Sequence, residues 1–273
     1  MMPDSLPTRP IVTLTTDWGW RDFFVGRVKG YLLSAIPGVE IVDIAHDLDP
    51  YTITRAAFVV THACLGFPPG TIHIIDVCSS QTAQSPFVVV QYRQQYFICT
   101  DNGLPSLVFR DDPGLLDHTV IIDKIPFDSP ANTFTFAACD LFCSVAALLV
   151  RGAHLSDIGF PPDSLRKVTM QENIVTPNGV DVKVTYIDRY GNIYLNITYD
   201  EFERLRAGRP FRLLFNGEYI SEIDYDYVNH SKGHYPVMLT VSSTGLLEIA
   251  VYRNSAERVS NLAFLDTVRV LFG

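Results

Sequence analysis

Residues 11–19 read IVTLTTDWG, and the prediction of the fold starts from this stretch. Residues 11–15 are apolar or β-branched, as in a buried strand, and the TDWG that follows is typical of the loop at a strand end. Residues 24–36 then carry apolar side chains at helical spacing, and Pro37-Gly38 ends that helix. A strand, a loop and an amphipathic helix in this order predict the first crossover of an α/β sheet.

The same alternation continues through the first half of the chain. Further strands are predicted at residues 41–44, 71–76, 87–92, 96–99 and 119–122, and further helices at residues 51–65 and 138–150. Strands rich in branched residues that alternate with crossover helices are typical of a parallel sheet. We therefore predict that residues 1–165 form an α/β domain with a mainly parallel sheet.

The pattern changes beyond residue 156. Pro161-Pro162 and Pro177-Asn178-Gly179 indicate a connector and a turn, so we place a linker at residues 166–178. Short strands separated by Gly, Asn or Ser are then predicted at residues 180–187, 211–215, 219–220, 237–241, 246–251 and 267–271, with one short helix at 201–206. Residues 179–273 are therefore predicted to form a small all-β domain, a barrel or a sandwich.

Composition narrows the class of protein. A chain of 273 residues with 47% hydrophobic side chains can bury a sizeable core, which argues against disorder. A formal net charge of −9 disfavours nucleic acid as a partner, because binding to a phosphate backbone needs clustered Lys and Arg. The sequence has no apolar run of about 18 residues or more and no leader segment, so we expect no membrane association and a cytoplasmic location.

The cysteine pattern argues against both disulfides and metal. The five cysteines form no CxxC pair, and their odd number disfavours a disulfide framework. Cys139 and Cys143 lie one helical turn apart and could share a face, but packing is the favoured interpretation and no metal is expected.

Carboxylates follow several strands of the first domain. Asp17 and Asp22 come after the first strand, and Asp76 ends another. Ligands of open α/β sheets bind beyond the carboxyl ends of the strands, so Asp17 can accept hydrogen bonds from both hydroxyls of a ribose, and Asp76 can orient water or a cationic sulfur. The alternatives are that Asp17 and Asp22 cap the following helix and that Asp76 fixes a turn. Asp101-Asn102-Gly103 is typical of a tight turn, whatever the function.

Two strings of the second domain also carry polar groups. In IDRYGN, residues 187–192, Asp188 can bind an ammonium group and Asn192 a carboxylate, although the string is also an ordinary hairpin turn. Residues 245–252 read GLLEIAVY, and this strand can present its backbone and Tyr252 to a planar base, although a plain buried strand has the same pattern. Neither string alone decides between a ligand site and a structural role.

Several strings occur in a characteristic order along the chain. They are LTTDWG at 14–19 with Asp22, VDIAH at 42–46, FPPGTIH at 67–73, DNG at 101–103, ID at 187–188 with YGN at 190–192, and GLLEIA at 245–250. In this order they resemble the S-adenosylmethionine hydroxide adenosyltransferase family, which is related to the fluorinases and chlorinases. The resemblance covers nearly the whole chain.

The resemblance implies an N-terminal α/β domain, a C-terminal β domain, and a homotrimer whose sites lie between the N-terminal domain of one subunit and the C-terminal domain of the next. By matching motif, it implies that Asp17 holds the ribose hydroxyls, that Asp22 and Asp188 hold the methionine ammonium, and that Asn192 holds the methionine carboxylate. The backbone around Tyr252 would meet adenine, and family members often have Asn at that position. S-adenosylmethionine is then the substrate or ligand, and no cofactor is implied.

The resemblance also implies a reaction. Hydrolytic members of the family attack ribose C5′ with water or hydroxide and release adenosine and L-methionine. Their water-handling residues are an Asp, an Arg seven residues later, and a His in a TFHGRD string. Asp76 matches the Asp, but Ala83 stands at the position of the Arg, and in TFAACD at residues 135–140 Ala137 and Cys139 replace the His and the second Arg.

Three hypotheses follow. The first is a hydrolase with Asp76 as its catalytic residue, and the alternative is a non-catalytic sensor of S-adenosylmethionine or adenosine that has lost the hydrolytic Arg and His. The third is a purely structural trimer. A halogenase is disfavoured, since those enzymes have Tyr at the position of Asp76. We favour the hydrolase because the chain retains Asp17, Asp22, Asp76, Asp188 and Asn192. The roles of Cys78 and Cys139 are left open.

Overall fold

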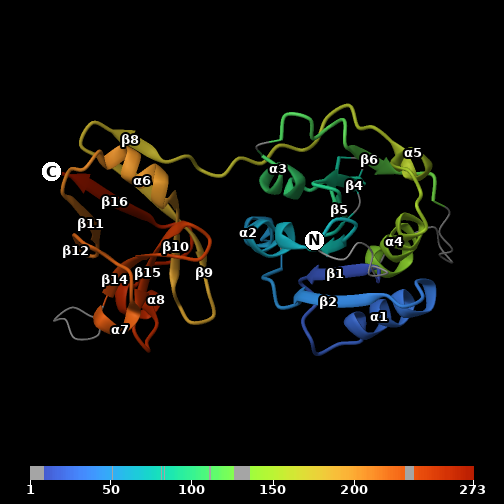
Figure 1. Ribbon diagram of the computed structural model, residues 1–273, viewed down its shortest axis with the longest axis horizontal. Coiled ribbons are helices and arrows are strands. Elements are labelled where there is room, and N and C mark those ends of the chain that lie inside the picture. Colours follow the sequence, from blue (N-terminus) through green and yellow to red (C-terminus); the bar gives the residue numbers. More distant parts are fainter. Residues whose placement is uncertain are drawn as a thin grey trace, which may run out of the picture. The chain divides into compact units, whose positions relative to one another are not determined.

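The computed structural model of the protein describes residues 9–50, 52–80, 82, 84–110, 112–125, 136–230 and 237–273. The chain divides into two compact units, an N-terminal unit (Met1–Met170) and a C-terminal unit (Gln171–Gly273) (Figure 1). This division lies within residues 166–178, where the sequence predicts a linker. Each unit has its own sheet and its own hydrophobic core.

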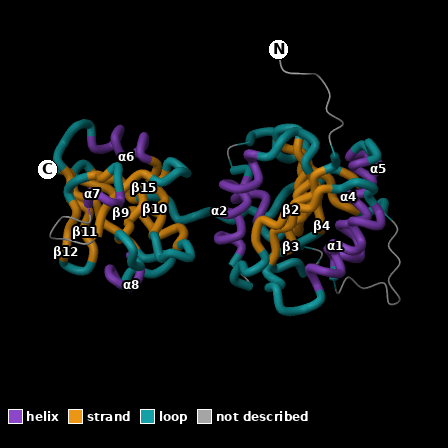
Figure 2. The backbone as a smooth tube through the Cα atoms, turned by 60° about the horizontal axis from the view of Figure 1, so that its bottom comes forward, coloured by secondary structure: helices purple, strands orange, loops and turns teal. Residues whose placement is uncertain are grey.

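In the N-terminal unit the described residues form a seven-stranded sheet with the order β2-β1-β3-β5-β4-β6-β7 (Figure 2). The strands are β1 (Ile11–Thr16), β2 (Glu40–Ala45), β3 (Ile72–Asp76), β4 (Phe87–Tyr92), β5 (Gln95–Thr100), β6 (Thr119–Ile122) and β7 (Gly159–Phe160). β2, β1, β3 and β5 pair in parallel, whereas the pairs β5–β4, β4–β6 and β6–β7 are antiparallel. The sheet is mixed, and the prediction of a mainly parallel sheet is only partly right.

A tight hairpin explains where the sheet turns antiparallel. β4 and β5 are joined by Arg93 and Gln94, whose φ angles are 49° and 61°. Two successive left-handed residues form a turn whose twist matches that of the flanking strands, and so short a loop joins only antiparallel strands. Such turns favour Gly, Asn and Asp, so Arg93-Gln94 gives no hairpin signal in the sequence.

Helices cover both faces of this sheet. They are α1 (Phe24–Ala35), α2 (Ile53–Ala63), α3 (Leu104–Val108), α4 (Cys143–Val150) and α5 (Leu155–Ile158), with a 3-10 turn η1 (Cys64–Gly66) and a π-helical turn η2 (Ala138–Phe142). The three helices predicted from the sequence are confirmed as α1, as α2 with η1, and as η2 with α4. The short α3 and α5 are not predicted.

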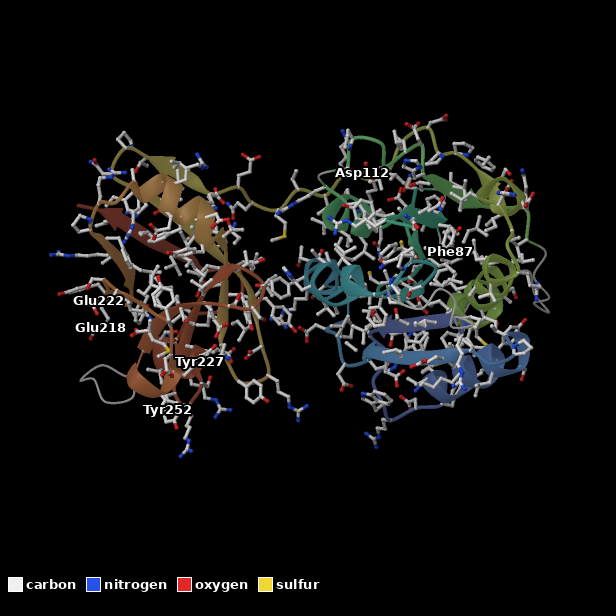
Figure 3. All side chains as sticks on the ribbon, in the orientation of Figure 1. Phe87, Asp112, Glu218, Glu222, Tyr227 and Tyr252 are labelled. Carbon is white, nitrogen blue, oxygen red and sulfur yellow. The ribbon has the colours of Figure 1, made fainter. Side chains whose placement is uncertain are left out.

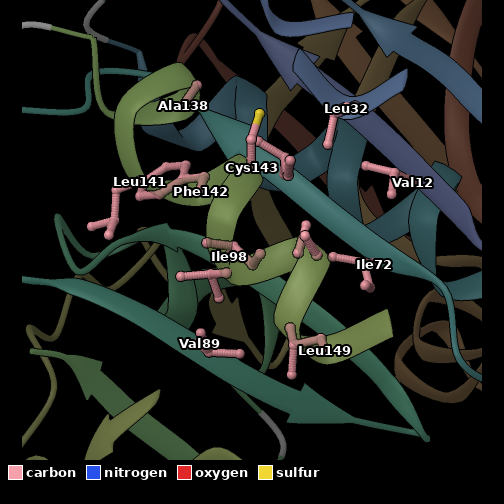
Figure 4. Close-up of a cluster of buried hydrophobic side chains, with 14 of the residues drawn as sticks. Val12, Leu32, Ile72, Val89, Ile98, Ala138, Leu141, Phe142, Cys143 and Leu149 are labelled. Atoms are coloured by element: carbon pink, nitrogen blue, oxygen red, sulfur yellow. The ribbon is translucent and has the colours of Figure 1, made fainter. Parts of the chain in front are cut away.

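The two faces of the sheet carry separate hydrophobic clusters. α1 and α4 pack on one face, where Leu32 and Cys143 join strand residues such as Val89 (Figure 4). α2 and α3 pack on the other face, where Val60 joins Val88. Adjacent residues of one strand point to opposite faces, so Val88 and Val89 belong to different clusters. The central strands β1, β3 and β5 are therefore largely buried on both sides, whereas β2 has no fully buried residue.

The C-terminal unit is built on a nine-stranded sheet that curls around one core, with the order β12-β11-β16-β9-β10-β15-β14-β13 and β8 paired to β9 (Figure 2). Its strands are β8 (Ile174–Thr176), β9 (Gly179–Ile187), β10 (Ile193–Thr198), β11 (Phe211–Phe215), β12 (Glu218–Ile220), β13 (Ile223–Asp224), β14 (Val237–Val241), β15 (Leu246–Val251) and β16 (Thr267–Phe272). Its helices are α6 (Tyr199–Arg206), α7 (Tyr227–His230) and α8 (Ala256–Ser260). The prediction of a small β unit with a short helix at 201–206 is confirmed, and β8, β10 and β13 are additions to it.

Three further observations bear on the class of protein. All five cysteines are free thiols, and four of them are buried. Among the described residues, no group of three or more His, Cys, Asp or Glu is placed to hold a metal ion. In the same part of the chain, no helix combines the length and the apolar composition that crossing a bilayer requires.

Candidate functional site

Two carboxylates lie at the carboxyl edge of the N-terminal sheet. β1 and β3 pair in parallel with Thr16 opposite Asp76, so Asp17 follows directly beyond that pair. Asp76 ends β3 and is buried, whereas Asp17 is half-buried. The Oδ2 atom of Asp17 accepts a 3.0 Å hydrogen bond from the backbone N–H of Cys78, in the loop after β3. The register of the sheet therefore brings together two carboxylates that the sequence places after different strands.

The surroundings of Asp76 change its acidity. Burial raises the pKa of the Asp76 carboxyl to about 6, and the charge of Asp17 acts in the same direction. Hydrogen bonds from the Ser79 side chain first, then from the Trp18 side chain and the backbone N–H of Ala138, favour the ionised form and oppose this rise in pKa. A carboxyl whose pKa lies near neutrality can take up and release a proton at physiological pH. Asp76 thus has the acidity of a general base.

The turn that differs from the family pattern lies against Asp76. η2 begins at Ala138, whose backbone N–H donates to the Asp76 carboxylate. The flanking Ala137 and Cys139, which replace the His and Arg of the pattern, are both buried. Burial raises the pKa of the Cys139 thiol, and the nearby Arg27 of α1 acts against this rise. A guanidinium from another helix thus lies beside the position where the pattern has Arg. Ala83 lies outside the described residues.

A buried histidine anchors the loop that carries Asp17. The Nδ1 atom of His46 lies 2.7 Å from Thr16 Oγ1, and its Nε2 atom lies 3.0 Å from Asp43 Oδ1. Its backbone carbonyl accepts a 2.7 Å hydrogen bond from the N–H of Gly19. Contacts on both sides of Asp17 therefore fix the loop, and VDIAH, one of the strings of the resemblance, supplies them.

The capping interpretation of Asp17 and Asp22 is wrong. The N-cap residue of α1 is Phe23, and no side chain forms a capping hydrogen bond there. Asp17 binds the backbone of Cys78 instead, and Asp22 is exposed. Both carboxylates remain at the loop between β1 and α1.

The Asp101-Asn102-Gly103 turn has the structural role that its composition suggests. The Asn102 amide donates to the carbonyl oxygens of Val77 and Cys78, at 3.0 and 3.2 Å. The Asp101 carboxylate accepts from the backbone N–H of Arg166. The turn after β5 therefore supports the loop after β3, whose backbone holds Asp17.

The C-terminal unit has an open pocket of about 730 Å³. The three predicted residues of this unit, Asp188, Asn192 and Tyr252, all line it, together with Tyr227 of α7. Figure 3 labels two of these side chains, Tyr227 and Tyr252. Asp188 follows β9 and Asn192 precedes β10, while Tyr252 follows β15, which pairs with β10. Sheet pairing therefore brings together strings that are 60 residues apart, Asn192 and Tyr252, in one pocket.

Asp188 organises the turn at this pocket. Its Oδ1 atom accepts from the backbone N–H groups of Tyr190 and Asn192, at 2.8 and 2.9 Å. Its Oδ2 atom accepts from the side-chain amide of Asn192 at 3.0 Å. The hairpin-turn interpretation is therefore right, and it is compatible with a ligand role, because the turn fixes a carboxylate and an amide at the pocket wall.

Glu248 has a place near this pocket that the sequence analysis missed. It lies in β15 with 2% of its surface exposed, and it accepts a 2.8 Å hydrogen bond from the hydroxyl of Tyr227. Burial raises the pKa of the Glu248 carboxyl, and the charge of Asp188 acts in the same direction. The signal was present as one acidic residue inside LLEIAV, because a carboxyl in a buried strand needs polar partners.

Known proteins match nearly the whole chain. A curated (R)-S-adenosyl-L-methionine hydrolase of Methanocaldococcus jannaschii is 25% identical over 276 residues and aligns with 96% of each chain. Another, of Thermus thermophilus, is 28% identical over 277 residues, which cover 96% of this chain and 100% of the relative. A fluorinase of Nocardia brasiliensis is 26% identical over 239 residues, 75% of this chain and 77% of the relative.

Solved structures share the fold of this chain, and two family models name its family. An uncharacterized conserved protein from Thermotoga maritima has a TM-score of 0.82 and 26% identity, covering 96% of this chain and 99% of its own. A conserved hypothetical protein from Thermus thermophilus, with a TM-score of 0.72, 24% identity and coverage of 97% and 100%, shares the fold. The models of the N-terminal and C-terminal domains of the SAM hydroxide adenosyltransferases match residues 12–159 and 182–269. The chain therefore belongs to the S-adenosylmethionine hydroxide adenosyltransferase family.

Proposed function

We propose that this protein hydrolyses S-adenosylmethionine to adenosine and L-methionine. The observation that carries the proposal is the buried carboxyl of Asp76, which lies beside Asp17 at the edge of the sheet. The pKa of Asp76 is raised to about 6. Relatives that align with nearly the whole chain are named (R)-S-adenosyl-L-methionine hydrolase, which supports the same reaction. A carboxyl of this acidity suits the activation of a water molecule.

In the proposed mechanism the N-terminal unit holds the ribose and the water. Asp17 accepts hydrogen bonds from the two ribose hydroxyls, and Asp76 orients a water molecule on the face of C5′ opposite the sulfur. The water oxygen bonds to C5′ while the C5′–S bond breaks and its electron pair stays on sulfur. The proton of the water passes to Asp76 and then to solvent. The leaving thioether is neutral and needs no acid, so alignment of the reactants supplies much of the acceleration.

The C-terminal unit holds the rest of the substrate in this proposal. Asp188, with Asp22, binds the methionine ammonium, and Asn192 binds the carboxylate through its amide. The backbone beside Tyr252 contacts adenine. Asp188 and Asn192 already share one turn at the wall of the pocket, which supports their action on the two ends of one α-amino acid.

The proposal includes a homotrimer in which the N-terminal unit of one subunit completes its site with the C-terminal unit of the next. Light scattering measures the assembly. Mixing two inactive variants, Asp17→Ala and Asp188→Ala, by co-expression tests the shared site. In a random mixed trimer about one quarter of the sites receive two unaltered halves, so activity returns to about that fraction. Two variants that stay inactive together place the site within one subunit.

A non-catalytic sensor is the second candidate, and one observation favours it. The turn packed on Asp76 carries Ala137 and Cys139, both buried, where hydrolytic members have His and Arg. Removing one preorganised donor from a catalytic site costs about 100- to 1000-fold in rate in the best-studied case. A ligand pocket does not depend on such groups.

In the deciding experiment the purified protein is incubated with S-adenosylmethionine, and the release of adenosine and methionine is followed by chromatography. Calorimetry measures the binding of S-adenosylmethionine in parallel. The hydrolase proposal expects the two products in equal amounts, loss of both in Asp76→Ala, and no loss in Asp117→Asn, a control at an exposed carboxylate. Tight binding without products in the wild-type protein identifies the sensor instead.

A further inference from the structure

Glu248 is the most buried acidic side chain of the C-terminal unit that the mechanism above does not use. It lies on the face of β15 opposite the core, because its neighbours Leu247 and Ile249 point into the core. Tyr227 reaches it from α7 with its hydroxyl, at 2.8 Å. A carboxyl so enclosed keeps a charge only through its partners.

Tyr194 connects this carboxyl to the pocket. Tyr194 of β10 stands directly opposite Glu248 in the β10–β15 ladder, so their side chains share one face of the sheet. Its hydroxyl lies 3.5 Å from Asp188 Oδ2 and also within reach of Glu248, so its single O–H hydrogen is shared between the two carboxylates. One phenol therefore lies between the buried carboxyl and the carboxylate at the pocket wall.

The charges of the Asp188 and Glu248 carboxylates favour the binding of a cation. Asp188 already accepts three hydrogen bonds from its own turn, from Tyr190 and Asn192. Glu248 adds a second acid within electrostatic range of it. Burial raises the pKa of both Tyr194 and Tyr227, so the two phenols stay protonated donors and add no charge. Two neighbouring acids with neutral donors repel each other, and a cation between or beside them relieves that repulsion.

We infer that Glu248 is a positioning residue for the ammonium of the bound amino acid: it competes with Asp188 for the Tyr194 hydroxyl and adds a second negative charge to the ammonium subsite. This inference rests on the proposed function, because it takes Asp188 as the ligand of that ammonium. Glu248 itself does not touch the ligand. Its effect is confined to the amino-acid half of the substrate and leaves the adenosine half unchanged.

A dependence on pH follows. The titratable groups that face Glu248 among the described residues are Tyr227 from α7, Tyr194 from β10 and Asp188 from the turn after β9. The two phenols favour the ionised carboxylate, whereas burial and Asp188 disfavour it. The charge of Glu248 therefore appears as pH rises through its raised pKa, and affinity for an ammonium ligand rises with it. A bound ammonium lowers that pKa in turn.

The test compares two ligands that differ in the amino-acid half, S-adenosylmethionine and adenosine, by calorimetry. Glu248→Gln should lower the affinity for S-adenosylmethionine by about ten-fold, which corresponds to one pKa unit of interaction. The affinity for adenosine should stay within about two-fold of the wild-type value. The pH dependence of S-adenosylmethionine affinity should flatten in this variant. Glu218→Gln, the same change at an exposed strand residue, should alter neither ligand.

Tyr227→Phe provides a second variant that keeps the charge. It removes a donor that stabilises ionised Glu248, so the rise of affinity should move to higher pH while its plateau is retained. Equal losses for both ligands in Glu248→Gln, or no loss for either, would overturn the inference. Binding without turnover, with the two-ligand split intact, would overturn the hydrolase and leave the inference standing. A wild-type protein that binds no S-adenosylmethionine contradicts both.

Discussion

In each unit a buried carboxyl lies beside a more exposed aspartate, Asp76 beside Asp17 and Glu248 beside Asp188, but the two pairs are built differently. In the N-terminal unit Asp76 accepts from the Ser79 side chain and also from an indole and a backbone N–H, with Asp17 as neighbour. In the C-terminal unit Glu248 accepts from two phenols, with Asp188 as neighbour. Backbone and indole donors are held by the chain itself, whereas a phenol hydroxyl rotates to suit its partner. The first arrangement suits the proposed role of Asp76 in orienting a water molecule, and the second suits the proposed response of Glu248 to a bound cation.

The sharpest contrast between the units comes from Asp17→Ala. Loss of two charge-assisted hydrogen bonds to the ribose should lower affinity by at least about 100-fold, because each such bond contributes about 1.5–3 kcal/mol. The loss should be equal for adenosine and S-adenosylmethionine, unlike that of Glu248→Gln, since both ligands contain the ribose. Calorimetry with both ligands checks this, and unchanged adenosine affinity would show that Asp17 does not hold the ribose.

The next effect is on stability. The pKa of Asp76 is about 6 in the folded protein against 3.8 for an ordinary carboxyl, so the folded state binds the proton more strongly. Below about pH 4 the buried Asp76 therefore does not lower the free energy of unfolding. As pH rises through about 6, the free energy of unfolding falls by on the order of 2–3 kcal/mol. Asp76→Asn should recover stability of that order at pH 8 and almost none at pH 4.

Urea unfolding at the two pH values measures the gain. Glu248→Gln should change stability in the same direction, since the pKa of Glu248 is also raised. A destabilised Asp76→Asn at pH 8 would mean that the bonds from Trp18 and Ala138 outweigh the cost of burial.

The rate of hydrolysis provides a smaller effect. Asp76 must be ionised to accept a proton, and its pKa of about 6 predicts that turnover at saturating substrate falls about ten-fold between pH 7 and pH 5. The loss reports the N-terminal carboxyl if it persists in Glu248→Gln. A profile that flattens in Glu248→Gln would assign the titration to the C-terminal unit instead.

The smallest effect is expected from Tyr252→Asn. The backbone at this position is proposed to contact adenine, and a backbone contact survives exchange of the side chain. Affinity for adenosine should therefore change by less than about three-fold, the range of an ordinary surface substitution. A larger loss would show that the Tyr252 ring itself carries base recognition.

Residues at strand ends could be predicted from the sequence because one rule places them. Asp17 and Asp76 follow apolar strands, and the parallel register brings such ends to one edge of the sheet. The direction of β4 could not be predicted, because it depends on the left-handed conformation of Arg93 and Gln94. Residues of these two types are not typical of that conformation, which favours Gly, Asn and Asp.

The environment of Glu248 shows a different limit. Tyr227 lies 21 positions before it, on a helix of one turn within an irregular stretch, so no periodicity links the two. Tyr194 lies in β10, where more buried and less buried residues alternate. In the sequence this strand follows a turn so closely that the strand is not recognised as a separate element. A partnership between residues on three elements depends on tertiary packing, and the pattern of one segment does not contain it.

The π-helical turn η2 contains one residue more than an α-helical path requires. The orientation of the preceding residues about the axis of α4 depends on this extra residue, and a single deletion would change it. Removing one residue between positions 138 and 142 would rotate the preceding segment by about 100° relative to α4. The N–H of Ala138 would then leave Asp76, and residue 137 would face another direction. A one-residue deletion in this turn would therefore change the groups that contact Asp76 without altering the residues of the sheet or of α4.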